Sequence, residues 1–120
     1  MKSINMKQID DKDREMVSLL RSLGMDRLAA CTLTYLAGQP QATAREIEHG
    51  SGLRQPEVSK ASKYLRKQGW MEESQVLGER GRPKKVYRLK VPMTEIANYL
   101  EGIEVRKAGR VRDAIDRAKA

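Results

Sequence analysis

Apolar residues in the first half of the chain are spaced as they are in helices. From Asp10 to Leu23 they recur three and four residues apart, with charged side chains on the other side, which predicts an amphipathic helix. The stretch from Leu28 to Leu36 is apolar on nearly all sides, which predicts a second helix at the centre of the core. Thr43-Ala44-Arg45-Glu46 matches a capping box and opens a short third helix, which Gly50-Ser51-Gly52 ends.

The middle of the chain predicts a basic helix followed by a β-hairpin. A proline and a glutamate suit the first helical turn, so we expect a helix over about 56–68, ended by Gly69. Segments 70–77 and 85–91 then have the composition and alternation of strands. Between them lies ERGRPKK (79–85), whose glycine and proline predict a hairpin loop longer than a two-residue turn.

A final helix is expected from about 93 to 119. Its apolar residues form a seam with coiled-coil spacing, which Lys107 interrupts. No other segment is left to cover this seam, which favours contact with a second subunit; the alternative is packing back on the helix over 10–23. The residues assigned to the dimer interface are Ile96, Leu100, Ile103, Val111 and Ile115.

These elements predict a mainly α chain with a small β-hairpin, an α+β fold in three parts. Residues 1–25 would form an N-terminal helix that packs on the core or contacts a second subunit. Residues 26–91 would form the central domain, and 92–120 a C-terminal helix for dimerisation. The tight link between the third and fourth helices has the form of a helix-turn-helix.

The positive charge of the chain is concentrated in the middle. The net charge is +8, and residues 54–90 carry 11 basic and 4 acidic side chains, whereas residues 1–53 carry 7 of each. A focused excess of this kind points to a polyanionic partner. The alternative is a general surplus for solubility, but such a surplus would be spread along the chain.

Several classes of site are not expected. One cysteine, Cys31, and one histidine, His49, cannot form a metal site within one subunit. There is no glycine-rich nucleotide fingerprint, and the carboxylates follow solvated helix faces, so we expect no enzyme activity and no cofactor. The lack of an apolar run of signal-peptide or membrane-span length indicates a cytoplasmic protein without membrane contact.

The segment TAREIEHGSGLRQPEVSKASKYLRKQGWMEE resembles the helix-turn-helix of winged-helix transcriptional regulators, the MarR, ArsR and TrmB-like group of bacteria and archaea. The matching frame includes Thr43 as N-cap, the Gly52-Leu53 turn and Gly69 before the first wing strand. The resemblance covers about 26–91, and departs from the usual pattern at Glu48, where alanine is common, and Ser62, where leucine is common. It implies a winged helix-turn-helix with flanking helices, in a homodimer that binds double-stranded DNA at the nucleoid and regulates transcription.

The resemblance also assigns roles to side chains. The helix over 56–68 would enter the major groove, where the N-terminal end of an inserted helix meets base edges. The base-reading residues would be Gln55, Glu57, Ser59 and Lys60. Arg82 would enter the minor groove, and the phosphate contacts would be Arg54, Lys63, Lys67, Arg80, Lys84, Lys85 and Arg88. Two alternatives remain at this point: a non-specific architectural DNA protein, and a winged-helix module that binds proteins of the transcription or RNA-processing machinery.

Overall fold

Five helices and a three-stranded antiparallel sheet make up residues 10–119, the part of the chain that the structure, a computed structural model, describes. Residues 1–9 of the expected N-terminal part, and Ala120, lie outside it. The helices are α1 (Asp11–Ser22), α2 (Arg27–Ala37), α3 (Ala44–Ser51), α4 (Gln55–Lys67) and α5 (Met93–Lys119). The strands are β1 (Ala42–Thr43), β2 (Met71–Leu77) and β3 (Pro83–Leu89), with a short 3-10 turn, η1 (Glu79–Gly81), between the last two.

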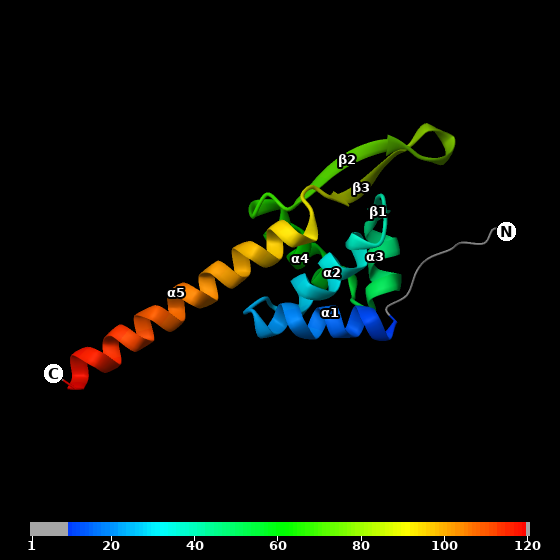
Figure 1. The fold of residues 1–120 in the computed structure, drawn as a ribbon. Coiled ribbons are helices and arrows are strands. Elements are labelled where there is room, and N and C mark those ends of the chain that lie inside the picture. Colours follow the sequence, from blue (N-terminus) through cyan, green and yellow to red (C-terminus); the bar gives the residue numbers. More distant parts are fainter. Residues whose placement is uncertain (1–9, 120) are drawn as a thin grey trace.

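Helix α2 forms the centre of the body, as its apolar pattern predicts. It contacts α1, α3, α4 and β3, and α1 lies along the edge of the body (Figure 1). Leu33 and Leu36 of α2 are fully buried, together with Ile47 of α3 and Leu65 of α4. The orientation of α3 and α4 is therefore set by side chains that pack on one common helix.

The two departures from the usual helix-turn-helix pattern are accommodated differently. Ser62 is buried, as a leucine would be, and its hydroxyl donates to the carbonyl oxygen of Ser59 over 3.4 Å. This bond satisfies a polar group that would otherwise be costly in the core. Glu48 is half-buried on α3.

The sheet contains one strand more than the hairpin expected from the sequence. Its order is β1-β3-β2, and Ala42 and Thr43 of β1 lie opposite Tyr87 and Val86. The strand is only two residues long because Thr43 is also the N-cap of α3, where it forms the expected capping box with Glu46. This short pairing fixes the base of the hairpin to the start of the helix-turn-helix.

The hairpin of β2, η1 and β3, called the wing below, projects from the body (Figure 1). Its strands pair from Met71↔Leu89 at the base to Leu77↔Pro83 near the tip. Strand β3 begins two residues earlier than expected, because Pro83 can occupy the first position of a strand. The loop is correspondingly shorter than predicted, although it is still longer than a two-residue turn.

Helix α5 has the predicted bounds, but its two halves lie in different surroundings. Ile96 and Leu100 are 0% and 5% exposed and belong to the subunit's own core, and Ile103 is half-buried. The assignment of Ile96 and Leu100 to a dimer interface is therefore wrong: the body of the same subunit covers them. Val111 and Ile115 are 59% and 49% exposed, on the half of α5 that extends away from the body (Figure 1).

The extended half of α5 gives the chain its long axis. The dimensions are 71 × 28 × 24 Å. No helix within residues 10–119 is both long enough and apolar enough to cross a membrane.

Replacement of Ile96 by alanine should lower the free energy of unfolding by about 2–5 kcal/mol, because it leaves a cavity in the core. Val105→Ala on the same helix is the control, since Val105 is 71% exposed and its loss leaves no cavity. Urea denaturation followed by circular dichroism measures both. Equal effects of the two substitutions would show that the first half of α5 is not part of the core.

Candidate nucleic-acid interface

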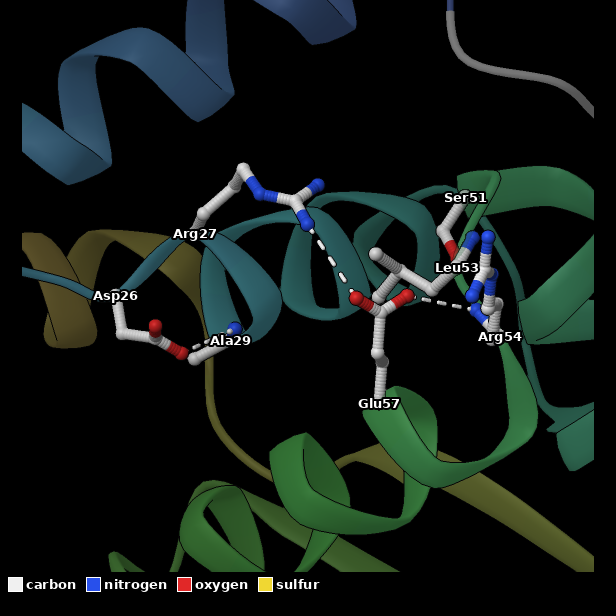
Figure 2. A network of polar contacts seen from close by, with 7 residues as sticks. All are labelled: Asp26, Arg27, Ala29, Ser51, Leu53, Arg54 and Glu57. Atoms are coloured by element: carbon white, nitrogen blue, oxygen red, sulfur yellow. Dashed lines mark hydrogen bonds and ion pairs between the residues drawn. The ribbon is translucent and has the colours of Figure 1, made fainter.

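The turn between α3 and α4 is held by a dense set of backbone contacts. Gly52 has a left-handed backbone (φ +75°), which ends α3 and which residues other than glycine adopt at a cost. The hydroxyl of Ser51 donates to the carbonyl oxygen of Ile47 and accepts from the amide of Leu53, 3.3 Å away. Leu53 is buried, so the turn is anchored in the core just before α4 begins (Figure 2).

Glu57 has a role that the sequence did not indicate. Its Oε1 accepts from the backbone amide of Arg54 over 2.9 Å, and its Oε2 lies 3.5 Å from Nη2 of Arg27 on α2 (Figure 2). Both oxygens are thus used to cap α4 and to join it to α2. This carboxylate therefore positions the helix, and the expected contact of Glu57 with cytosine stays a prediction.

The outer face of α4 carries the remaining residues expected to read bases or bind phosphates. Val58, Ala61 and Leu65 are buried on the opposite face, which fixes the rotation of the helix about its axis. No lysine of α4 has an ion-pair partner within residues 10–119. The exposed side chains are Gln55, Ser59, Lys60, Lys63 and Lys67, with Arg54 at the N-cap.

The tip of the wing is a tight loop that presents three cations. The amide of Gly78 donates to the carbonyl oxygen of Arg82 over 2.7 Å, and a side chain at position 78 would place its Cβ 2.9 Å from that oxygen. Arg80 has φ +61°, a left-handed conformation that is uncommon outside glycine. Arg80, Arg82 and Lys84 are exposed, and none has an ion-pair partner in the described part of the chain.

At the base of the wing, two cations of β3 are paired with carboxylates of β2, whereas Lys90, just beyond β3, has no ion-pair partner within residues 10–119. Arg88 forms an ion pair with Glu72, and Nζ of Lys85 lies 3.9 Å from Oε2 of Glu73. Lys85 and Arg88 thus each have a carboxylate partner within the wing, and their expected contacts with phosphates stay predictions. Sequence reasoning missed these carboxylates. The strand register, which places Glu72 opposite Arg88, would have revealed the first pair.

Three aromatic residues join α4, the wing and α5. Trp70 is buried, with ring centroids 6.3 Å from Tyr64 and 5.6 Å from Tyr99, both in edge-to-face contact. Burial raises the pKa of the Tyr64 hydroxyl, with smaller contributions from Tyr99 and Asp26, so it stays protonated at neutral pH. The cluster fixes the C-terminal end of α4 relative to the first strand of the wing.

A shallow pocket lies between α1, α2 and α3. Its volume is about 450 Å³, and Arg14, Cys31 and His49 are among its lining residues. Burial raises the pKa of the Cys31 thiol, and nearby Arg27 opposes this shift, so the thiol is protonated at neutral pH. Within residues 10–119, no group of three histidine, cysteine or carboxylate side chains is arranged to hold a metal ion.

No protein-family model matches the sequence, and no curated protein matches it by sequence. Solved structures do match the fold. A possible transcriptional regulator from Methanosarcina mazei aligns with a TM-score of 0.64 and 16% identity, over 87% of each chain. A MarR family regulator from Neisseria meningitidis aligns with a TM-score of 0.51 and 21% identity, over 86% of this chain and 80% of that one.

A third structure, described as a transcriptional regulator, has a TM-score of 0.57 and 22% identity over 87% of this chain and 68% of its own. At these identities the likeness shows the fold. The chain has the winged helix-turn-helix fold with a long C-terminal helix, and the expected resemblance to winged-helix regulators is confirmed at that level.

Proposed function

We propose that the protein is a sequence-specific, double-stranded DNA-binding regulator of transcription that acts as a homodimer at the nucleoid. The observation that carries this proposal is the distribution of unpaired cations. Of the 11 cations in residues 54–90, seven have no ion-pair partner within residues 10–119 and lie either at the N-cap and outer face of α4, the second helix of a helix-turn-helix, or at the tip of the wing that follows it. The matched structures, which are described as transcriptional regulators, support the same reading.

Helix α4 would enter the major groove, which is wide enough to admit one helix. Gln55, Ser59 and Lys60 would then face base edges near its N-terminal end, where glutamine can pair with adenine and lysine with guanine. Arg54, Lys63 and Lys67 would contact the flanking phosphates. At the wing tip, Arg82 would enter a narrow minor groove, and Arg80 and Lys84 would bind the backbone beside it.

The exposed apolar side chains on the second half of α5 are the evidence for a homodimer. An isolated helix of this length is marginal in water, because most of the stability of a helix in a protein comes from packing one of its faces. Val111 and Ile115 are exposed there, and Met16 and Leu19 are exposed on α1. A second copy that covered these apolar side chains would stabilise the extended helix and bring two copies of α4 into one particle.

The proposed function is tested by selecting bound duplexes from random DNA. The affinity for the selected duplex is then compared with the affinity for scrambled duplexes of the same length. We expect the selected site to bind about 10³-fold tighter or more, with half-sites about 34 Å apart. A ratio near one would instead identify an architectural DNA protein. No binding to any duplex at low salt would favour the protein-interaction module.

Lys60→Ala and Lys67→Ala should separate base reading from phosphate binding. Loss of Lys60 removes a donor to a base, so it should reduce discrimination at one base pair by about 1–3 kcal/mol. Loss of Lys67 should weaken binding equally on all duplexes and reduce the slope of log K against log[salt] by about 0.9. Fluorescence anisotropy on single-base variants of the selected site measures both. Identical profiles for the two variants would contradict the assignment.

Val111→Glu should convert the dimer to a monomer, because it places a charge in the proposed apolar interface. Val105→Glu is the matched control, since it makes the same change about 120° further round the same helix. Sedimentation equilibrium gives the mass, and the monomer should lose most of its affinity for a two-half-site duplex. A dimer that tolerates Val111→Glu, or that is broken equally by Val105→Glu, would exclude this interface.

A further inference from the structure

Glu73 connects three elements at the base of the wing. Its Oε1 lies 3.4 Å from Nη1 of Arg66 in the last turn of α4, and its Oε2 lies 3.9 Å from Nζ of Lys85 in β3. The Glu73 side chain is only 25% exposed. The pKa of Tyr87, which lies opposite on β3, is raised first by burial and then by the charge of Glu73 and a hydrogen bond to it. One carboxylate thus holds the end of the proposed recognition helix and both strands together.

The same carboxylate changes which cations can reach DNA. Residues 54–90 contain 11 lysines and arginines, and Glu73 together with Glu72 holds three of them: Arg66, Lys85 and Arg88. Of the other eight cations in this segment, seven lie at the N-cap and outer face of α4 and at the wing tip, and the eighth, Lys90, follows β3. Two cationic surfaces are therefore separated by a region in which charge is compensated.

Such a separation matters because non-specific DNA binding comes almost entirely from cations that neutralise phosphates, in any orientation of the protein. Base contacts need one orientation. Cations that are held by carboxylates add little to non-specific binding, which depends on phosphate neutralisation. They do not weaken the base contacts that give sequence-specific binding.

We propose, on the basis of the function proposed above, that Glu73 is a specificity-determining positioning residue. It withholds Arg66 and Lys85 from DNA phosphates and fixes the wing against the end of α4. The protein therefore contacts DNA through α4 and the wing tip, with few sequence-independent contacts at the wing base.

Glu73→Gln tests this inference, because it keeps the shape of the side chain and removes the charge that holds the two cations. On scrambled duplexes, affinity at low salt should rise about 3- to 10-fold, and the slope of log K against log[salt] should steepen by about 1–2, corresponding to one or two additional phosphates. The ratio of affinities between the selected and the scrambled duplex should fall. Glu15→Gln on α1 is the control for net charge, and it should leave the slope unchanged.

A second pair of variants makes the same test without altering Glu73. Lys84→Gln removes an unpaired cation and should reduce the salt slope by about 0.9, whereas Lys85→Gln removes a cation held by Glu73 and should leave the slope unchanged. In the double variant with Glu73→Gln, Lys85→Gln should remove part of the increase in slope.

The outcomes are distinguishable. A slope that is unchanged or shallower in Glu73→Gln would mean that Glu73 only stabilises the wing, and would overturn the inference. Equal effects of Lys84→Gln and Lys85→Gln, or of Glu15→Gln and Glu73→Gln, would overturn it as well. If the wild-type protein binds no duplex, the proposed function itself fails, and the inference fails with it.

Discussion

The packing of other elements around α2 is the constraint on which the rest of the structure depends. Because α2 is apolar on nearly all sides, α1, α3 and α4 can each bury a face against it, and the turn between α3 and α4 is pulled into the core at Leu53. The outer face of α4 is then the only part of that helix left for a partner. Glu57 and Arg27 add a polar link between α4 and the same central helix.

The elements that could be predicted from the sequence are those whose signals are local. The five helices follow from apolar periodicity, from the capping box at Thr43 and from glycines that end helices. Strand β1 was missed because two residues carry no periodicity, and its partner lies more than forty residues away in the chain. The seam of α5 was misassigned in part because Ile96 and Val111 have the same spacing, and only the surrounding body decides which is covered.

In the candidate site, too, the residue types could be predicted from the sequence, whereas their interaction partners could not. The sequence identified the basic segment, but it could not say which cations are free, because that depends on strand register and on contacts between α4 and β2. Glu57 caps α4, and Glu72 and Glu73 form ion pairs with cations of β3. The partners of these three carboxylates follow from the fold and not from the sequence. The composition of a segment gives the number of its charged side chains. Only the fold determines how many of them have no ion-pair partner.

The length of α5 has a mechanical consequence. In the proposed dimer formed through its second half, the helix would act as a lever about 24 Å long between the subunit contact and the body that carries α4. A change of about 10° in the angle at which the two levers cross would shift the two bodies relative to each other by about 4 Å, close to the rise of one base pair. The spacing of sites that such a dimer accepts would then be set by side chains far from any base.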